Sequence, residues 1–544
     1  MTKRLSHRGP LSIFSEKLPA GMIRFGLLSE SPFIFKNKFD DRFVKHILID
    51  KCHEFTTFLP AEVLRILDSR DQRSDIFATQ MINAVGITED NQIRVFRSVD
   101  GARPLYYAEL EYGIALSSEK KGIWEITEEK PKIFNPGTVL TVSEDGTWEF
   151  EKIQSYIRSE RKFNPVTISK VSDIRPPEYK RTEIELAQMM TAHSKPPEYW
   201  EEDDIESFTL HESQTERSFI LDNLSGSLRS IIPLRLKLRI CGVLFSGGVD
   251  SSLLAMRVKS VAGLKGTRLI SVTAPESIDT KITKRAAHRL SATLYSGARF
   301  DHTIVPFDEE TVWNILPEVI YAIETTRRMD VEISIPFFLA ARWARDEGIK
   351  ILLSGQGPDE LFAGYARYEK SLIESGAEKV EEELWSDFSV THENNIVRDE
   401  KAIAYHGINS LFPFLDAGFC NLAFAIPIEY LLDPSAEPSR KIIFREVAKW
   451  FGVPEEIANA QKRATQFSSG STKMLRNAVK KYVEDAKDLN KKEMSILTIK
   501  VIHTIASEIG IPGARKPIQQ LVMDMKPTQR LIERVGRLPT RNLG

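Results

Sequence analysis

Apolar residues recur with two different spacings along the chain from residue 217 onward. Helical spacing appears in three segments, which hold Ile220, Leu224, Leu228 and Ile231, then Ile282, Ala286 and Leu290, then Ile315, Val319 and Ile323. Short continuous apolar runs occur at residues 240–245, 268–274, 302–307 and 349–354. Runs of this length are typical of buried strands, and strands that alternate with helices are typical of βαβ units. The pattern therefore predicts an α/β fold with a doubly wound parallel sheet.

The rest of the chain departs from this pattern on both sides. Residues 1–155 mix short β-like runs, such as 92–99 and 138–142, with turn sequences, which predicts an α+β domain. Residues 156–215 hold paired prolines and an acidic run but few periodic apolar positions, which indicates an exposed linker or insertion. After about residue 370 the chain is mostly helix-like and ends in a basic, irregular tail. The predicted parts are therefore 1–155, 156–215, 216–475 and a helical C-terminal extension at 476–544.

Composition and net charge indicate which kinds of molecule the protein binds. The chain has 544 residues, 42% of them hydrophobic and 28% charged, which is typical of a globular protein of roughly two to four domains. Its formal net charge of -2 gives no overall attraction to nucleic acid or to an anionic membrane. The longest apolar stretch, residues 419–432, is too short to cross a bilayer. We therefore expect small-molecule partners, with neither nucleic acid nor membrane, and leave a homodimer open.

The number and spacing of the cysteines indicate the cellular compartment. Cys52, Cys241 and Cys420 are widely spaced and form no CxxC pair, so neither a disulfide framework nor a zinc site is indicated. The first residues carry positive charge but no apolar segment of the kind found in secretory signals. These features predict a cytoplasmic protein.

The loop "SGGVDSS" at residues 246–252 joins a predicted strand to a predicted helix. In doubly wound sheets ligands bind beyond the carboxyl ends of the strands. Gly247 and Gly248 let backbone N–H groups approach an anion, and the start of the helix adds its positive end. Asp250 would repel a bare phosphate unless a divalent cation lay between them, so the loop predicts a magnesium-bound pyrophosphate site. The alternative is a Ser/Gly turn in which Asp250 caps the helix.

A second loop follows a later predicted strand, in "ILLSGQGPDELFAGYARY" at residues 351–368. Gly355 and Gly357 free the backbone there, and Asp359 offers a second magnesium ligand. Two carboxylates at two strand ends could hold one polyphosphate between them.

These two loops together resemble the synthetase domain of the asparagine synthetase family, a group of PP-loop ATP-pyrophosphatases. The resemblance continues through "NNIVRDEKAIAYHGINSLFPFLD" (394–416), "KIIFREVAKWFGVPEEI" (441–457) and "QKRATQFSSG" (461–470). It covers about residues 217–475. Each motif alone is a weak signal, but their occurrence together and in order is highly specific.

The resemblance implies that ATP activates a carboxylate as an acyl-adenylate, that pyrophosphate leaves, and that an amine then attacks. It implies ATP and Mg²⁺ as cofactors, Asp250 and Asp359 as metal ligands and catalytic residues, and Lys462 as the catalytic lysine. An ammonium group suits the charge that develops as the adenylate forms and collapses. The alternative for Lys462 is a solvated basic residue. The nucleotide-binding residues implied are Ser246, Gly247, Gly248, Val249, Asp250, Ser251, Ser252, Val272, Ser354, Gly355 and Gln356.

Three differences from the bacterial asparagine synthetases matter for the substrate. Gln356 replaces the glutamate of "SGEGSDE", which removes a negative charge and any base function beside the adenylate. Asp330 and Glu332 lie where those enzymes carry Thr and Arg. These changes concern the acid and the amine more than the ATP chemistry.

The N-terminal region resembles a degenerate glutaminase domain of the Ntn-hydrolase type. Segments similar to that fold are "HRGP" (7–10), "FRSVDGARPLYY" (96–107), "ALSSEKKGI" (115–123) and "NPGTVLTV" (135–142). Active members have Cys after the initiator Met, whereas Thr2 occupies that position here, and a glutamine-holding "NGEIYN" segment is missing. Cys52 cannot replace the nucleophile because an internal cysteine lacks a free α-amine. We expect no glutaminase activity; the alternative is an unrelated α+β domain.

The leading functional hypothesis is an asparagine synthetase-type ligase that uses aspartate and takes ammonia directly. One alternative is a ring-closing relative, like the β-lactam synthetases or lasso-peptide cyclases. Another is a non-catalytic ATP-binding scaffold, against which the joint presence of Asp250, Asp359 and Lys462 argues.

Overall fold

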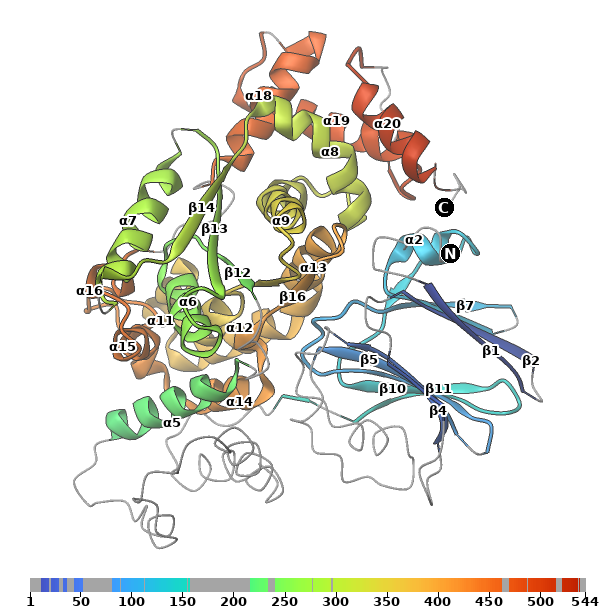
Figure 1. The fold of residues 1–544 in the computed structure, drawn as a ribbon, viewed down its shortest axis with the longest axis horizontal. Helices are drawn as coiled ribbons and strands as arrows, with labels where there is room; N and C mark the ends of the chain where they lie inside the picture. The colour runs from blue at the N-terminus through green and yellow to red at the C-terminus, as the bar shows by residue number, and fades with distance from the viewer. Residues whose placement is uncertain are drawn as a thin grey trace, which may run out of the picture.

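A computed structural model defines the fold (Figure 1). It describes the backbone of four strands between residues 11 and 51 and, from residue 81, most of the chain in four segments. These segments are 81–156, 216–232, 240–461 and 469–538, with short gaps at 89, 112, 154, 276, 295–296, 487, 515–520 and 537.

A five-stranded, fully parallel sheet forms the centre of the C-terminal part of the chain. The strand order is β14-β13-β12-β15-β16. The bounds are β12 Cys241–Leu244, β13 Thr267–Thr273, β14 Asp301–Pro306, β15 Ile351–Leu353 and β16 Asn409–Leu411. The parallel α/β sheet predicted from the apolar runs is therefore confirmed, and the first four strands lie within the predicted runs or within one residue of them.

The edge strand β16 was not predicted, because the chain after residue 370 reads as mostly helix-like. It pairs with β15 over Ile351↔Asn409 to Leu353↔Leu411. A three-residue strand is shorter than one helical turn and too short to show the two-residue alternation of a strand more than once, so periodicity alone cannot separate it from a buried helix end.

Helices cover both faces of the parallel sheet. In Figure 1, α7 (Ile278–Ala292) lies on one side of β13 and β14, and α9 (Arg328–Asp346) lies on the other. The helix α6 (Val249–Ala262) packs against β12 and β13. Next along the chain, α8 (Glu309–Ile323) buries the predicted apolar stripe of Ile315, Val319 and Ile323. Asp308 caps its start by accepting a hydrogen bond from the Thr311 backbone N–H.

The strand order reverses at one point of the sheet, between β12 and β15. From β12 the chain proceeds outward to β13 and β14, then returns to place β15 on the other side of β12. At such a switch point the loops after the two central strands separate and leave a crevice at the carboxyl edge of the sheet. These two loops hold "SGGVDSS" and "SGQGPDE", so the topology brings the two predicted motifs together.

Three C-terminal helices pack on α8 and extend the apolar core around it. They are α18 (Ser471–Tyr482), α19 (Lys491–Glu508) and α20 (Lys526–Val535), which lie near the top of Figure 1. Their presence agrees with the helical pattern predicted for this part of the sequence. None of the helices in the described segments is long and apolar enough to cross a membrane.

The N-terminal part forms antiparallel sheets beside the parallel one (Figure 1). A six-stranded sheet has the order β11-β10-β6-β5-β4-β3, and smaller sheets pair β8-β7-β9 and β1-β2. The bounds are β1 Leu11–Leu18, β2 Gly21–Leu28, β3 Phe33–Lys36, β4 Val44–Lys51, β5 Ile82–Thr88, β6 Ile93–Arg97, β7 Tyr106–Leu110, β8 Gly113–Ser117, β9 Lys132–Ile133, β10 Thr138–Val142 and β11 Trp148–Lys152. A short helix, α2 (Lys120–Trp124), follows β8.

Several predictions for this part concern residues that the structure does not describe. "HRGP", Thr2 and Cys52 lie outside the described residues, as does the linker predicted at 156–215 beyond its first residue. The glutaminase-like nature of this region and the domain boundaries stay predictions.

Buried charges join the two parts of the chain. The Glu324 carboxylate, at the C-terminal end of α8, accepts hydrogen bonds from the backbone N–H groups of Lys120 and Lys121 at 2.9 and 2.7 Å. It also pairs with Lys401, whose side chain is almost fully buried. Because each charge has a partner of opposite sign, the junction can be buried without an isolated ion.

Candidate active site

A cavity of about 450 Å³ opens at the switch point of the parallel sheet. Residues from both central loops line it, together with residues of β13, α7 and α9. Of the residues predicted from sequence, its walls include Ser246, Gly247, Gly248, Val249, Asp250, Ser251, Val272, Ser354, Gly355, Gln356 and Asp359. The fold thus brings together, around one space, motifs that are about a hundred residues apart.

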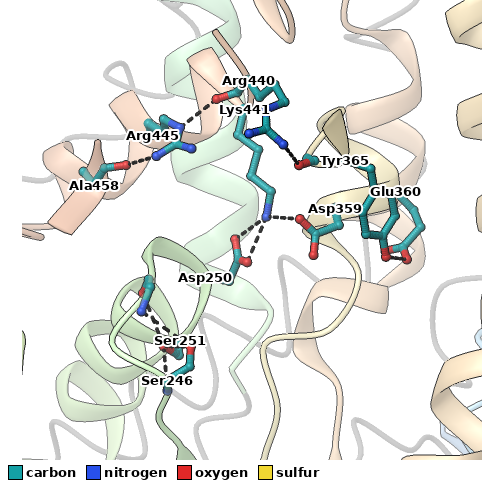
Figure 2. Close-up of polar contacts among 12 residues, drawn as sticks. Ser246, Asp250, Ser251, Asp359, Glu360, Tyr365, Arg440, Lys441, Arg445 and Ala458 are labelled. Carbon is teal, nitrogen blue, oxygen red and sulfur yellow. Dashed lines mark hydrogen bonds and ion pairs between the residues drawn. The ribbon is translucent and has the colours of Figure 1, made fainter. Parts of the chain in front are cut away.

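The first loop presents the start of α6 to this cavity. Gly248 is the N-cap residue and has no side chain to satisfy the first N–H groups of the helix, which leaves them for an anion. Gly247 has φ +75°, and a Cβ atom there would lie 3.1 Å from the Cβ of Ala286. The Ser246 and Ser251 hydroxyls lie 3.2 Å apart and add polar hydrogens beside the loop (Figure 2).

Ser252 differs from the other predicted loop residues. Its side chain is fully buried and is not part of the cavity wall. Its hydroxyl forms no hydrogen bond within the described part of the chain. Ser252 is therefore placed behind the loop rather than facing the cavity.

A buried lysine links the two predicted metal ligands. The Lys441 ammonium donates hydrogen bonds to both carboxylate oxygens of Asp250, at 2.7 and 2.8 Å, and its Nζ lies 2.8 Å from Asp359 Oδ1 (Figure 2). Asp250 belongs to the first turn of α6, and Asp359 to the short helix α10 (Pro358–Leu361) after β15. Two loops and a third segment therefore converge on one positive charge.

The charge of Lys441 is set by competing effects. Burial lowers its pKa, but the carboxylates of Asp250 and Asp359 outweigh burial and raise the pKa above its usual value. Lys441 is therefore an ammonium at neutral pH and neutralises part of the charge of the acid pair.

The backbone around this contact is shaped to admit the lysine. Lys441 precedes α15 (Ile442–Trp450) and has φ +57°, an uncommon conformation for a residue with a side chain. Opposite it, Gly364 leaves the space that the ion pair occupies. A Cβ atom at Gly364 would lie 2.0 Å from Asp359 Oδ1 and 2.5 Å from Lys441 Cε.

Arg445, one turn into α15, lines the same cavity. Its Nε donates to the Arg440 carbonyl at 2.7 Å, and its NH1 donates to the carbonyls of Ala458 and Ala460. These bonds hold a second positive charge beside the acid pair.

The second loop carries Gln356 toward a buried carboxylate. Gln356 Nε2 donates a 2.7 Å hydrogen bond to Asp399 Oδ2, on α13 (Val397–Ala404). The neighbouring Gly355 lies against the first loop, since a Cβ atom built on it would be 3.4 Å from Asp250 Cβ. The residue that replaces the expected glutamate is therefore next to the predicted phosphate loop.

The other two departures, Asp330 and Glu332, lie on α9 with arginine partners. Asp330 is 3.4 Å from Arg327 and 3.7 Å from Arg398, and Glu332 is 3.2 Å from Arg328. Thr472 also donates to Glu332 at 3.0 Å, while burial raises the pKa of this carboxyl. Neither residue is among those that line the cavity.

One wall of the cavity is apolar. Leu244 of β12, Ile270 and Val272 of β13, and Pro336 and Phe337 of α9 contribute apolar side chains to the cavity lining. A flat, weakly polar group such as an adenine ring suits such a lining, whereas the start of α6 suits anions.

Asp250 and Asp359 are the residues that could hold a metal ion. Within the described ranges, no group of three or more His, Cys, Asp or Glu side chains is arranged to bind one. Mg²⁺ is often bound by one or two carboxylates with the remaining ligands from water and substrate phosphates. The two carboxylates, already drawn together around the Lys441 ammonium, fit a cation of that kind.

Lys462, predicted as the catalytic lysine, lies outside the described residues, and its role stays a prediction. Lys441 was not predicted as a site residue, although it opens the segment "KIIFREVAKWF" that carries part of the resemblance. No local pattern marks it as a site residue, because its contact with Asp250 depends on how α15 packs against α6.

The fold and the cavity place this chain among the α/β proteins that bind ligands at the carboxyl edge of a parallel sheet. The chain belongs to the asparagine synthase family, a family of ATP-dependent ligases: residues 237–377 and 373–510, together half of the chain, match the family model described as asparagine synthase. The resemblance stated from the motifs is thereby confirmed.

Individual relatives agree with this assignment. A Methanocaldococcus jannaschii protein named "Putative asparagine synthetase 1", glutamine-hydrolyzing, is 28% identical over 80% of this chain and 77% of its own length. An asparagine synthetase domain-containing protein of Saccharomyces cerevisiae is 28% identical over 52% of this chain and 58% of its own. Asparagine synthetase B of Escherichia coli, glutamine-hydrolyzing, is 28% identical over 47% and 44% respectively. The match thus spans about half the length of the yeast and bacterial relatives.

Proposed function

We propose that this protein activates a carboxylic acid with ATP as an acyl-adenylate, releases pyrophosphate, and forms an amide with ammonia, with aspartate as the first acid to test. The observation that supports the proposal most is that Asp250 and Asp359 both contact the Lys441 ammonium. This contact lies beside the start of α6, which suits an anion, at the switch point of the sheet. The start of α6 would be sufficient to bind a phosphate group. The pair of facing carboxylates in addition suits a triphosphate that is bound together with a metal ion.

In the first step an oxygen of the acid attacks the α-phosphorus of ATP, and the bond from that phosphorus to the β-phosphate oxygen breaks. The N–H groups at the start of α6, with Ser246 and Ser251, would hold the departing pyrophosphate. Asp250 and Asp359 would hold Mg²⁺, which when bound offsets the negative charge of the phosphates. Lys441 and Arg445 add fixed positive charge at the same place.

In the second step the nitrogen of the amine attacks the acyl carbon, and the bond from that carbon to the AMP oxygen breaks. AMP leaves with the bonding electrons, and the nitrogen loses a proton to solvent. Lys462 is proposed to donate to the acyl or phosphate oxygens as charge develops on them. Val272 and the apolar wall would hold the adenine ring.

Ammonia, rather than glutamine, is proposed as the nitrogen source. A glutaminase of this type needs a nucleophilic thiolate. Both cysteines in the described segments are buried, and burial raises the pKa of Cys241 to about 12 and that of Cys420 well above its usual value. Neither can serve as that nucleophile, which supports direct use of ammonia.

The test measures acid-dependent exchange of labelled pyrophosphate into ATP, and then amide formation with ammonium, for wild type and for Asp250→Asn. We expect exchange with a suitable acid in wild type and a loss of roughly 10²-fold or more in Asp250→Asn, since the variant removes charge from the phosphate site. Asp346→Asn, an exposed residue paired with Arg345, is the matched control and should exchange like wild type.

Three results would count against the proposal. Full exchange in Asp250→Asn would contradict the two-carboxylate site. Amide formed from glutamine, with glutamate released in equal amount, would contradict direct use of ammonia. If none of the acids in a panel that begins with aspartate supported pyrophosphate exchange, acyl-adenylate formation would be contradicted.

A further inference from the structure

Two arginines lie at the rim of the cavity, where it meets solvent. Arg285 and Arg289 are one turn apart on α7, and both line the cavity. Their side chains are 71% and 50% exposed. The same helix lies against the first loop, since a Cβ atom at Gly247 would be 3.1 Å from the Cβ of Ala286. Two exposed positive charges are therefore placed close to the loop that is proposed to hold pyrophosphate.

One carboxylate contacts both arginines. Glu456, on the short helix α16 (Glu455–Ala458), also lines the cavity. Arg285 NH2 donates to Glu456 Oε2 at 2.8 Å, and Arg289 Nε lies 2.7 Å from Glu456 Oε1. The carboxylate thus occupies the place that an anionic ligand would take between two guanidinium groups. A guanidinium has five N–H donors, so a contact through one nitrogen leaves donors for a further anion.

These contacts can be exchanged for contacts with a phosphate. An exposed ion pair stabilises a protein only slightly, because water and salt screen the charges. A guanidinium binds a phosphate group more strongly than it binds a neutral acceptor, and often through two parallel hydrogen bonds. A phosphate group at the rim can therefore displace Glu456 from the arginines without breaking any buried contact.

The positive charges that line the cavity extend from its buried part to its rim. Lys441 is buried and contacts the acid pair, and the buried Arg445 donates to the carbonyl of Ala458 on α16. Arg285 and Arg289 contact the same short helix from the exposed side. An anion that leaves the acid pair toward solvent would reach these two arginines on its way. Of the two products that carry phosphate, pyrophosphate is the one without an adenosine to hold it at the apolar lining.

We propose that Arg285 and Arg289 form an exit site for pyrophosphate, in which both guanidinium groups bind its outer phosphate and Glu456 takes the place of that phosphate once the product has left. This inference rests on the proposed adenylate-forming function and adds the route of its first product. Glu456 competes for the same donors, so it limits how tightly the product is held. No covalent bond changes at this site.

The first experiment measures binding of inorganic pyrophosphate with Mg²⁺ by isothermal titration calorimetry, which needs no turnover. In the double variant Arg285→Met, Arg289→Met, which keeps long side chains and removes their charge, we expect the Kd for pyrophosphate to rise about ten-fold. The Kd for AMP should stay as in wild type, because AMP has no outer phosphate. Lys284→Met, an exposed change on α7 outside the cavity lining, is the matched control.

A second variant separates a ligand site from an ion pair that only supports the fold. Glu456→Gln removes the competing carboxylate, so the Kd for pyrophosphate should fall by about three-fold, an effect of the size usual for an exposed ion pair. A purely structural ion pair would be lost in the arginine and the glutamine variants alike, and both would shift binding in the same direction. Glu455→Gln, exposed and outside the cavity lining, is the control for the change in net charge.

The exit site and the proposed function can fail separately. Unchanged pyrophosphate binding in the arginine double variant, an equal loss of AMP binding, or shifts of the same sign in the double variant and in Glu456→Gln would overturn the exit site. Equal shifts in the variants and their controls would overturn it as well. Acid-dependent exchange in wild type would leave the proposed function intact in each of these cases. If pyrophosphate binding depended on the arginines but no acid supported exchange, the anion site would stand and the proposed function would be contradicted.

Discussion

At the scale of single residues, Gly364 tests the geometry of the acid pair most directly. A methyl group there would overlap Asp359 Oδ1 and Lys441 Cε, so Gly364→Ala must move the carboxylate or the lysine. We expect ATP-dependent exchange to fall by about 10²-fold, the usual effect of misplacing a group at a reacting centre, with the fold retained. Kinetics of exchange, with a circular dichroism spectrum, would measure both.

A matched control is available on α5 (Glu216–Ser230). Gly226 is exposed in this helix, and a Cβ atom there would meet nothing within 4 Å. Gly226→Ala should leave exchange unchanged and raise stability by up to about 1 kcal/mol, since alanine favours a helix over glycine. If both alanine variants had the same activity, the space beside Lys441 would not matter to the site.

The residues of the site differ in how well the sequence could predict them. Asp250 and Asp359 were placed by local rules, because each follows a predicted strand and parallel strands end at one edge of a sheet. Lys441 could not be placed in this way. It lies 191 residues after Asp250 in the chain, and its approach depends on how α15 packs against α6, which no local pattern records.

At the scale of elements, the strands that could be predicted are those with a local sequence pattern, and the strand that was missed depends on tertiary pairing. The first four strands of the parallel sheet form continuous apolar runs because helices cover both faces of each. The edge strand β16 is only three residues long, and its sequence leads directly into the turn at Pro413, so its pairing with β15 decides its structure.

The end of α8 is the element on which the junction with the N-terminal sheets depends. Burial raises the pKa of Glu324, but Lys121 and Lys401 outweigh it and the pKa is lowered, so the group is a carboxylate. Glu324→Gln would leave Lys401, which also donates to the Tyr106 hydroxyl at 2.8 Å, buried without its anionic partner. We expect the free energy of unfolding to fall by about 3–5 kcal/mol, measured by urea denaturation.

An exposed ion pair serves as the control for this variant. Glu374, on α11 (Ala366–Ser375), lies 3.7 Å from Lys370, and both side chains are more than half exposed. Glu374→Gln should change the free energy of unfolding by less than about 0.5 kcal/mol. Equal effects of the two substitutions would show that the buried cluster does not hold the junction.

At the scale of the whole molecule, two half-buried histidines couple stability to pH. Burial lowers the pKa of His302, on β14, and of His392, beside Gly101 of the N-terminal part, to about 4 each. Lys284 and Arg97, respectively, lower these pKa values further. The usual value for an exposed histidine is about 6.5. Between about pH 6.5 and 4, His302 and His392 are therefore mostly neutral in the folded protein and mostly protonated in the unfolded chain.

The sign of the effect follows from this difference. Above pH 6.5 both histidines are neutral in both states, and their contribution to stability is fully present. As the pH falls from 6.5 toward 4, the unfolded chain binds protons that the folded protein does not, so the free energy of unfolding falls, by about 2 kcal/mol for each partly exposed histidine. Urea denaturation at several pH values should show less of this loss in the His302→Gln, His392→Gln double variant than in wild type. His288→Gln, an exposed change on α7, should follow wild type, and parallel curves for all three proteins would contradict the assignment to His302 and His392.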